Sequence, residues 1–487
     1  MVTARAYLVI ADRLQSLIES SAFKPGDRLP SIRDLGRTHG VSVPTVQRAM
    51  EELESRGIVE ARPRAGFYVC WRYRAPTKLA ALGGASLLSG STALGRLVQH
   101  AMVTLERPGV CALGPSGPSD ELFPTLKLCR ATSAAVRRAG IHGLHAFDVA
   151  GATRLREEIA RRSPGSGCCL RPQEVVITAG CTEALSLCLR AVTAPGDTVV
   201  IETPAFYGLL LLLQTLNLNV IELPSDPCTG VDPDHVASAI AQRPVAAVIV
   251  SGNFSHPTGA LMPDRAKQRL VDLLAQQQIP LIEDDIFGDL YFGSRRPPPC
   301  KAYDRNGLVL LCDSFSKSIG SGYRVGWVAP GRFLERVLEI KLAQTGFTAT
   351  LPQLGVAEFL SRGGYERHLR GLRKTLSENV RRTALAVDRF FPAGTRYVRP
   401  SGGNFLWVEL PPVCDALALQ EAAAEQGISI APGPMFSNHA TGFAHYVRLN
   451  CGRLWSVQIE RALAQLGRLV VDQISERIGT PVSDARN

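Results

Sequence analysis

Apolar residues follow two different rhythms along the chain. In residues 1–60 they recur at helical spacing, as on the buried face of an amphipathic helix. Between about residues 170 and 330 they form short continuous runs that end in polar residues and glycines, which is typical of buried strands. These runs are Val175–Thr178, Thr198–Ile201, Val245–Val250, Pro280–Ile282 and Leu308–Cys312. Because helical stretches separate most of them, the pattern predicts an α/β fold with a doubly wound, mostly parallel sheet.

The N-terminal pattern predicts three helices followed by a hairpin. Residues 7–21 give the first helix, Ser31 starts a capping box for a short second helix, and Ser42 caps a third. Two strands, Ile58–Val59 and Phe67–Val69, then flank a basic turn. This order is typical of a winged helix-turn-helix that binds DNA. A small helical cap on an enzyme, with its basic residues merely solvated, is the alternative.

One lysine differs from the other basic residues in its setting. The run Leu308–Cys312 breaks at its carboxyl end into serines and glycines around Lys317, and Arg324 follows seven positions later. A lone loop lysine is usually a solvated surface charge. However, the carboxyl ends of strands in open α/β sheets bind ligands, and serines with an arginine supply phosphate contacts. We therefore expect an amine beside an anion site, which suits a Schiff base with an aldehyde-bearing phosphate cofactor.

Composition divides the chain into segments. Residues 1–74 carry the winged-helix pattern, and residues 75–92 are small and flexible in composition, as in an interdomain linker. Residues 93–475 are expected to form the large domain, with a smaller C-terminal α/β subdomain at about residues 345–475.

Charge and cysteine content narrow the function classes. The chain of 487 residues has a formal net charge of +10, and residues 1–74 hold twelve Lys/Arg against eight Asp/Glu, a surplus of four. This balance is compatible with a nucleic-acid partner. The twelve cysteines form no C-x-x-C pair, so we expect reduced thiols, no metal site and a cytoplasmic protein. No signal peptide or transmembrane segment is expected.

The N-terminal residues resemble a GntR-type DNA-binding domain. The resemblance rests on Pro25–Leu35, Gly40–Val46 and Leu53–Gly57, and it covers nearly all of residues 5–70. It implies contact with a double-stranded DNA operator through Arg33, Ser42, Thr45, Gln47 and Gly66. Val43 stands where many members have an arginine, which removes one contact. Three more arginines are expected to hold phosphates and to set register and salt dependence: Arg48, Arg62 and Arg64.

The stretch around Lys317 resembles the S-x-S-K-x-x-x-x-G-x-R-x-G segment of fold-type I pyridoxal 5'-phosphate (PLP) enzymes, the aspartate aminotransferase class. The resemblance runs from about residue 93 to residue 470. It implies that Lys317 carries PLP as an aldimine and that Asp284 pairs with the pyridine nitrogen and keeps the ring able to accept electrons. It also implies a wider set of cofactor contacts: Gly180, Cys181, Thr182, Phe206, Asn253, His256, Ser314, Ser316 and Arg324.

For some of these residues, the sequence pattern alone also allows a second interpretation. Thr178–Leu185 can offer backbone N–H groups of a helix N-terminus to a phosphate, or it can be an ordinary turn between strand and helix. Tyr207 is the rival of Phe206 for stacking on the ring. Arg448, in the middle of an expected strand, is either a rim residue with a buried stem or a clamp for the carboxylate of a substrate or effector. The resemblance favours the clamp and places the turn near Gly114 on the substrate side.

The chain departs from the family pattern at three polar positions. His256 replaces an asparagine that donates to the O3′ oxygen of the cofactor, and Phe287 replaces a tyrosine that does the same. Phe147 replaces a tyrosine that contacts the phosphate of a neighbouring subunit. The two altered O3′ donors normally help to set the pKa of the aldimine, so these changes argue against efficient turnover.

A GntR-type head joined to an aminotransferase-like body resembles the MocR family of bacterial transcription regulators. That resemblance implies a homodimer that binds DNA and senses an amino compound, or PLP itself, through the lysine aldimine. An active PLP-dependent aminotransferase with an accessory DNA-binding domain is the second hypothesis. A regulator whose body has lost PLP binding is the third.

Overall fold

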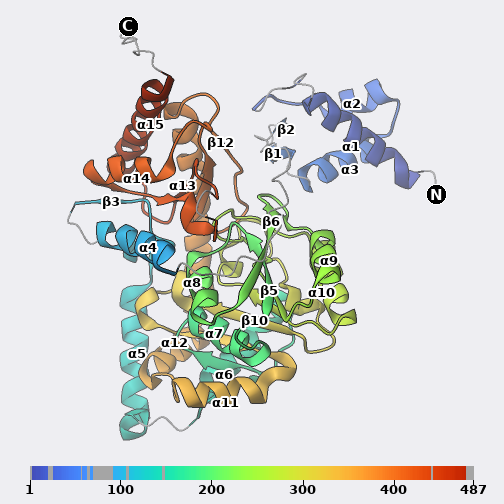
Figure 1. Ribbon diagram of the computed structural model, residues 1–487. Helices are drawn as coiled ribbons and strands as arrows, with labels where there is room; N and C mark the ends of the chain where they lie inside the picture. Colours follow the sequence, from blue (N-terminus) through green and yellow to red (C-terminus); the bar gives the residue numbers. More distant parts are fainter. Residues whose placement is uncertain are drawn as a thin grey trace. The chain divides into compact units, whose positions relative to one another are not determined.

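The computed structural model describes residues 3–19, 23, 26–55, 58–62, 66–69, 91–105, 109–144, 148–439 and 442–478. The chain forms two compact units (Figure 1). One comprises Met1–Thr77 with Arg396–Val398, and the other comprises Lys78–Thr395 with Arg399–Asn487. Most of the expected linker, residues 75–90, lies outside the described residues, so the predicted domain boundaries stay predictions.

The first unit is a winged helix-turn-helix. Its elements are α1 (Thr3–Glu19), α2 (Ile32–His39), α3 (Val43–Ser55), β1 (Val59–Arg62) and β2 (Gly66–Val69). Ile10, Leu14, Met50 and Leu53 are buried together in its core, as their helical spacing predicts. The expected cap on α2 is present, because the Ser31 hydroxyl accepts from the backbone N–H of Asp34 at 3.2 Å. Gly57 and Arg64 lie outside the described residues.

The second unit is built on a sheet of eight strands in the order β4-β11-β10-β9-β8-β5-β6-β7. Neighbours from β10 through β6 pair in parallel, whereas β11 is antiparallel to both β10 and β4. The strands are β4 (Val176–Thr178), β5 (Thr198–Thr203), β6 (Asn219–Asp226), β7 (Gly230–Val231), β8 (Ala247–Val250), β9 (Leu281–Asp284), β10 (Val309–Ser314) and β11 (Gly326–Ala329). The predicted doubly wound, mostly parallel sheet is therefore confirmed.

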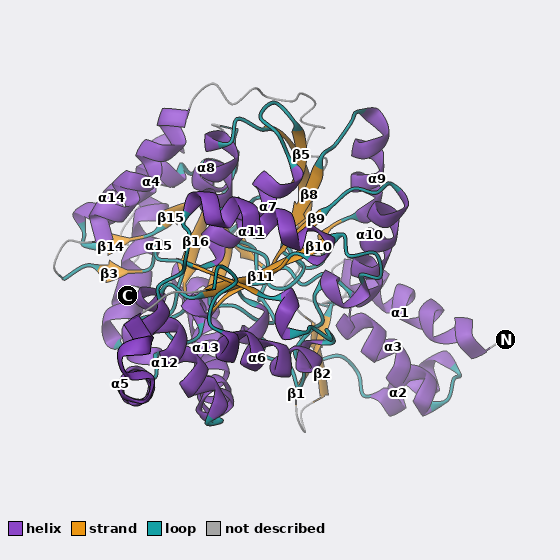
Figure 2. Cartoon of the chain, turned by 90° about the horizontal axis from the view of Figure 1, so that it is seen from below, coloured by secondary structure: helices purple, strands orange, loops and turns teal. Residues whose placement is uncertain are grey.

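Helices cover both faces of this sheet (Figure 2). Successive residues of β5 show why its sequence is apolar throughout: Val199 and Ile201 pack in one hydrophobic cluster, and Val200 packs in another on the opposite face. The helices nearest the sheet are α6 (Thr153–Arg162), α7 (Cys181–Val192), α8 (Tyr207–Thr215), α9 (Pro233–Gln242), α10 (Asp264–Gln276), α11 (Leu334–Gln344) and α12 (Thr350–Ser361).

A smaller sheet lies in the C-terminal part of this unit. Within this unit its strand order is β13-β16-β15, and β16 pairs antiparallel with β13 and β15. These strands are β13 (Phe405–Glu409), β15 (Ala431–Pro432) and β16 (Tyr446–Asn450). The helices here are α13 (Gly364–Phe390), α14 (Ala416–Glu425) and α15 (Val457–Ile478). The expected small α/β subdomain is thus present as secondary structure.

An early segment of the chain joins this C-terminal part. After α4 (Ser91–Leu105), the strand β3 (Cys111–Ala112) pairs in parallel with β14 (Ile428–Ser429). The helix α5 (Thr125–Ala139) then leads towards the large sheet and packs on α12. Residues 113–124 therefore run between the two sheets of the unit, and they carry the predicted Gly114. None of the helices in the described ranges is long and apolar enough to cross a membrane.

Candidate functional site

Five loops meet at one edge of the large sheet. They follow the carboxyl ends of β4, β5, β8, β9 and β10, which all run in the same direction. The predicted cofactor residues stand on these loops, because each immediately follows one of the apolar runs. The parallel sheet therefore brings together residues that are far apart in the sequence, at the edge where such sheets bind ligands.

Lys317 ends a short 3-10 turn, Phe315–Lys317, directly after β10. Its amine donates to the Ser116 hydroxyl at 3.0 Å and lies 5.6 Å from the centre of the Phe287 ring. Burial and the positive charge of Arg448 lower the pKa of this amine from its usual 10.5 to about 8. A larger share of Lys317 is consequently neutral and nucleophilic near physiological pH than for a surface lysine.

Asp284 ends β9 and faces the same space. Its Oδ1 accepts from the backbone N–H of Ile286 at 3.2 Å and from the Cys181 thiol at 3.3 Å. Burial raises the pKa of this carboxyl to about 6, while those two donors oppose the rise. The hydrogen bond from Cys181 connects Asp284 to the first turn of α7, so the thiol of Cys181 is one of the polar groups of the site.

A close contact between Gly180 and Arg324 shapes the expected anion site at the start of α7. Gly180 adopts a left-handed φ of 87°, and a Cβ built on it would lie 2.4 Å from the Arg324 guanidinium. Arg324 itself donates to the carbonyl of Ala179 at 2.8 Å. Only glycine at position 180 thus lets the arginine reach the helix N-terminus, where backbone N–H groups favour anions.

The serines before Lys317 form a small hydroxyl cluster. Ser314 and Ser316 place their hydroxyl oxygens 2.7 Å apart, and both side chains are buried. Ser314 also accepts from the backbone N–H of Ser316 at 3.0 Å and donates to the carbonyl of Val325 at 3.2 Å. Thr182, in the first turn of α7, is exposed at the same helix end.

Arg448 lies in β16 and is fully buried. One of its terminal nitrogens donates to His256 Nε2 at 2.6 Å, and the other donates to the carbonyl of Gly114. Its Nε is buried with no hydrogen-bond partner. Burial lowers the pKa of the guanidinium to about 10. A buried cation in this state favours an anionic ligand.

Aromatic rings enclose His256. The ring centres of Phe405, Phe206, Phe436 and Phe287 lie 4.9, 5.4, 5.5 and 5.9 Å from the imidazole centre. Phe206 also packs against Tyr207, with centres 4.7 Å apart, so both rivals for the stacking role lie at this edge. The surroundings of these residues are therefore apolar except for a few convergent polar groups, as small-molecule sites usually are.

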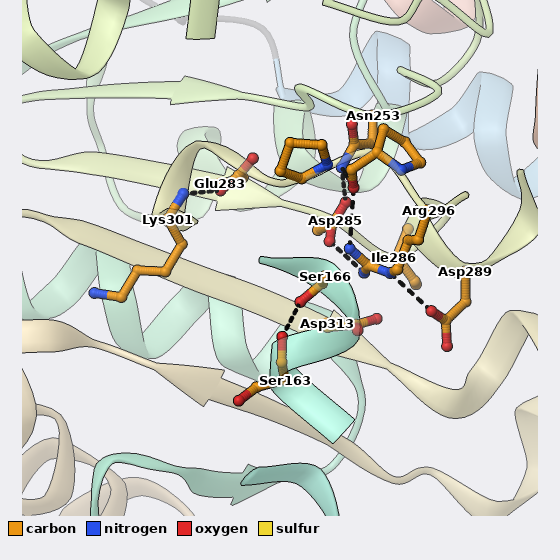
Figure 3. A network of polar contacts seen from close by, with 12 residues as sticks. Ser163, Ser166, Asn253, Glu283, Asp285, Ile286, Asp289, Arg296, Lys301 and Asp313 are labelled. Atoms are coloured by element: carbon orange, nitrogen blue, oxygen red, sulfur yellow. Dashed lines mark hydrogen bonds and ion pairs between the residues drawn. The ribbon is translucent and has the colours of Figure 1, made fainter. Parts of the chain in front are cut away.

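A chain of buried polar contacts lies behind the site (Figure 3). Arg296 donates to Asp285 at 2.6 Å and to Asp289 at 2.8 Å. Asp285 also accepts from Asn253 at 2.8 Å, and Asn253 accepts from Lys267 at 2.6 Å. These contacts fix the loop that follows Asp284, the last residue of β9, and that carries Phe287. They also engage the Asn253 side chain, for which a cofactor contact was predicted.

The predicted DNA-contacting residues cluster on α2, α3 and the wing of the first unit. Arg33 is exposed on the first turn of α2, and Gln47 is exposed on α3 and donates to Glu51 at 3.1 Å. The hydroxyls of Ser42 and Thr45 are 2.8 Å apart at the start of α3.

Two other predicted contacts lie on the same helix and on the wing. Arg48 lies 5.2 Å from the centre of the Tyr7 ring, and Gly66 begins β2 with a left-handed φ of 98°. The structure describes the backbone of Arg62 within β1.

Three contacts of the site could not be found from motifs. Ser116, Arg296 and the thiol of Cys181 as a partner of Asp284 belong to segments with no local signal for these roles. Phe147 lies outside the described residues, so its predicted place near a partner subunit stays a prediction. The roles predicted for the other residues also stay predictions, because the structure shows that these residues lie together but not which ligand they bind.

Comparison with known proteins agrees with this architecture. Residues 6–69 match the gntR family of bacterial regulatory proteins, and residues 124–466 match aminotransferase class I and II. The uncharacterized HTH-type transcriptional regulator YdcR of Escherichia coli (strain K12) is 36% identical over 96% of this chain and 100% of its own. The chain therefore belongs to the aminotransferase class I and II family. More specifically, it is a gntR-family DNA-binding domain fused to an aminotransferase domain, so the predicted MocR-type organisation is confirmed.

Enzymes of the same fold are also similar to this chain. The 2-aminoadipate transaminase of Thermus thermophilus is 29% identical over 79% of this chain and 95% of its own. A solved structure of LysN, the α-aminoadipate aminotransferase of Thermus thermophilus, is 27% identical, with a TM-score of 0.72 over 78% of this chain and 97% of that one. That structure is complexed with N-(5'-phosphopyridoxyl)-L-leucine.

Proposed function

We propose that the protein is a DNA-binding transcriptional regulator whose aminotransferase domain holds PLP and responds to an amino compound or to PLP itself. The observation that carries this proposal is the Lys317 amine, with its lowered pKa, at the carboxyl edge of the sheet in a chain that also has a gntR-family domain. Family membership supports double-stranded DNA as a partner, a homodimer as the assembly and the cytoplasm as its place of action.

The residues of the site fit PLP. Because Gly180 has no side chain, the Arg324 guanidinium can lie beside the N-terminus of α7, where it and the backbone N–H groups would hold a phosphate. Asp284 supplies a carboxylate for the pyridine nitrogen, and Lys317 supplies an amine for the aldehyde. Bound there, PLP supplies an aldehyde that condenses with amines and a ring that accepts electrons.

Contacts of the free lysine support a sensing role. Lys317 donates to Ser116, which lies two residues after Gly114, and the carbonyl of Gly114 accepts from Arg448. If Lys317 changes its hydrogen-bond partner, Ser116 loses its contact. Because Gly114 lies two residues earlier, the segment that also contacts Arg448 is then free to move. Two arrangements of this segment would give the domain two states whose balance a ligand can shift.

An active aminotransferase with an accessory DNA-binding domain is the second candidate. Retention of Lys317, Asp284 and Arg448 favours it, as does the similarity to the Thermus transaminase. Phe287, which offers no hydroxyl to the cofactor, argues against efficient turnover. Sustained transamination of a keto acid over many turnovers, measured with purified protein and excess amino donor, separates the two candidates. A regulator gives at most a few turnovers.

Arg33→Ala is expected to weaken DNA binding about tenfold or more, because the substitution removes an exposed guanidinium on α2, a helix of the domain that matches the gntR family, where we propose a DNA contact. The measurement is a titration, at fixed salt, of DNA fragments enriched by the wild-type protein from a random pool. The mass of the assembly in solution should stay unchanged.

Arg13→Ala is the matched control for this measurement. Arg13 is exposed on α1, a helix that carries none of the predicted DNA contacts. Its loss removes the same charge from the same domain and should change affinity less than about threefold. Equal affinities of Arg33→Ala and the wild type would contradict the assignment of Arg33, and enrichment of no DNA at all would contradict the regulator itself.

A further inference from the structure

A cavity of about 270 Å³ lies beside β10, and none of the residues predicted to bind the cofactor lines it. Leu311 and Asp313 of this strand face the cavity, whereas Cys312 between them packs in a different hydrophobic cluster, as the alternation along a strand requires. Its volume is near the lower end of the range for small-molecule pockets, which starts at roughly 300 Å³. The cavity is therefore large enough for a small ligand and separate from the cofactor residues.

The charged side chains around this cavity are not fully paired. Two of its arginines, Arg162 and Arg296, hold Asp289 in ion pairs, and Arg162 also pairs with Glu366. Among the described residues, the remaining two charged groups of the lining form no ion pair. They are one carboxylate, Asp313, and one guanidinium, Arg373. A cavity with one unpaired charge of each sign suits a ligand that also carries one charge of each sign.

The Arg373 guanidinium is held in place on one side and free on the other. Its Nε donates to the carbonyl of Asp289 at 2.7 Å, and its central carbon lies 3.8 Å from the centre of the Tyr291 ring. In the part of the chain that the structure describes, its two terminal nitrogens have no hydrogen-bond partner. The two parallel N–H groups of that free edge match the two oxygens of a carboxylate.

Asp313 is a carboxylate without a cation beside it. Its Oδ1 accepts from the backbone N–H of Ser314 at 2.6 Å, and no contact line joins it to Arg296 (Figure 3). Burial, together with the charges of Asp285 and Asp289, raises the pKa of Asp313 well above its usual value. Arg296, which already pairs with both of those carboxylates, only partly opposes this rise. The local field therefore favours an additional cation, which an ammonium group supplies.

We propose that this cavity binds a small amino acid, with its ammonium group at Asp313 and its carboxylate at Arg373. Apolar lining residues such as Leu311 cover the hydrocarbon part of the ligand. The Trp327 indole, only 8% exposed, has no hydrogen-bond partner among the described residues and offers one more donor. Phe315 also lines the cavity two residues before the cofactor lysine, so the ligand contacts the turn that carries this lysine. The inference goes beyond the proposed function and does not depend on PLP.

Matched ligands test each half of the site. Isothermal titration calorimetry with the full-length protein measures binding of L-leucine and of ε-aminocaproate, which differ in the separation of their two charges. The stronger of the two is then compared with the amine and the acid that each lack one charge. These are isoamylamine and isocaproate for L-leucine, and amylamine and caproate for ε-aminocaproate. The amino acid is expected to bind about tenfold or more tightly than either analogue, because each charged group gains a charge-assisted contact.

Two variants assign the charges to their residues. Arg373→Gln should reduce the preference over the amine to about threefold or less, and Asp313→Asn should do the same to the preference over the acid. Two exposed residues give matched controls, Arg370→Gln on α13 and Asp272→Asn on α10, and both should bind like the wild type. Lys317→Ala should also bind like the wild type, because Lys317 does not line the cavity.

The outcomes separate this inference from the proposed function. Failure of the wild type to bind either amino acid up to about 10 mM, or equal affinity for the amino acid and its analogues, overturns the inference without any variant. Binding that Lys317→Ala abolishes belongs to the cofactor site and contradicts it as well. Folded variants of Arg373 and Asp313 that keep both preferences show that these charges are not recognised. Attachment of PLP to Lys317 is measured independently, so either proposal can fail while the other stands.

Discussion

Lys317→Ala is expected to abolish covalent attachment of PLP to the protein. In the wild type, reduction with borohydride after incubation with PLP should leave a stable mass increase on the peptide that contains Lys317, and the visible absorbance band of the complex should depend on this residue. The variant should show neither. The reason is geometric: Lys317 is the amine that the sheet holds at its ligand-binding edge, 3.0 Å from Ser116.

The rate of this attachment should depend on pH in a way set by Lys317. Its pKa is about 8, so the neutral and reactive fraction rises with pH, is half of its maximum near pH 8 and levels off above about pH 9. Relative to a lysine with the usual pKa of 10.5, the neutral fraction at pH 7 is roughly 300 times larger, from a difference of about 2.5 pH units. Stopped-flow absorbance between about pH 6 and pH 10 measures this profile.

Two further variants make the result specific. Lys317→Arg keeps a cation in the site but cannot attach the aldehyde, so it should behave like Lys317→Ala. Lys374→Ala removes an exposed lysine of α13 and should attach PLP like the wild type. Attachment that persists in Lys317→Ala, or that Lys374→Ala reduces equally, would contradict the role of Lys317 and leave a DNA-binding protein with a different use for its large domain.

The large sheet and the position of Lys317 could be predicted because both depend on local pattern. Parallel strands buried on two faces are apolar throughout, and the ligand-binding loops follow their carboxyl ends directly. The predicted runs at residues 198–201 and 308–312 correspond to β5 and β10, each of which extends two residues further. The helices of the first unit could also be predicted, because the Ser31 cap and the apolar face of α3 are local sequence signals that span only a few residues.

The partners of the site residues could not be predicted, because they depend on long-range packing. Ser116 contacts a lysine 201 positions later, and Gly114 contacts an arginine 334 positions later. The family pattern predicts that His256 contacts the cofactor, but its Nε2 accepts from Arg448, and its ring packs against Phe206, Phe287 and Phe405 from distant parts of the chain. Strand β6 could not be predicted either. Its residues are mostly half-buried or exposed, so its sequence contains no continuous apolar run.

Arg296→Met is expected to lower the free energy of unfolding of the large domain by about 3–5 kcal/mol. The substitution roughly keeps the volume but removes the cation that joins Asp285 and Asp289. Asp285 is only 1% exposed, and across the described ranges Arg296 is its sole ion-pair partner, so its charge would remain buried with the Asn253 amide as a donor but no cation beside it. Urea unfolding followed by circular dichroism measures the loss. Affinity for PLP should fall as well, because Asp285 directly follows Asp284 in the chain.

The pH dependence of this loss identifies its cause. Burial alone would raise the pKa of Asp289, but Arg296 and Arg162 hold it at about 2, below its usual 3.8. A carboxyl with a lowered pKa stabilises the fold above its unfolded pKa, and that stability is lost as the pH falls through the folded pKa. The gap between the wild type and Arg296→Met should therefore narrow as the pH falls from about 4 towards about 2.

A neighbouring arginine and a second-site change test whether charge or packing is lost. Arg295 is 84% exposed and lies 3.8 Å from Asp264, so Arg295→Met should cost less than about 0.5 kcal/mol. Adding Asp285→Asn to Arg296→Met should recover part of the loss, because an amide no longer needs a buried cation. If Arg296→Met is as stable as Arg295→Met, the chain of contacts behind Asp284 does not hold the loop. If the double variant recovers nothing, packing rather than charge is what Arg296 contributes.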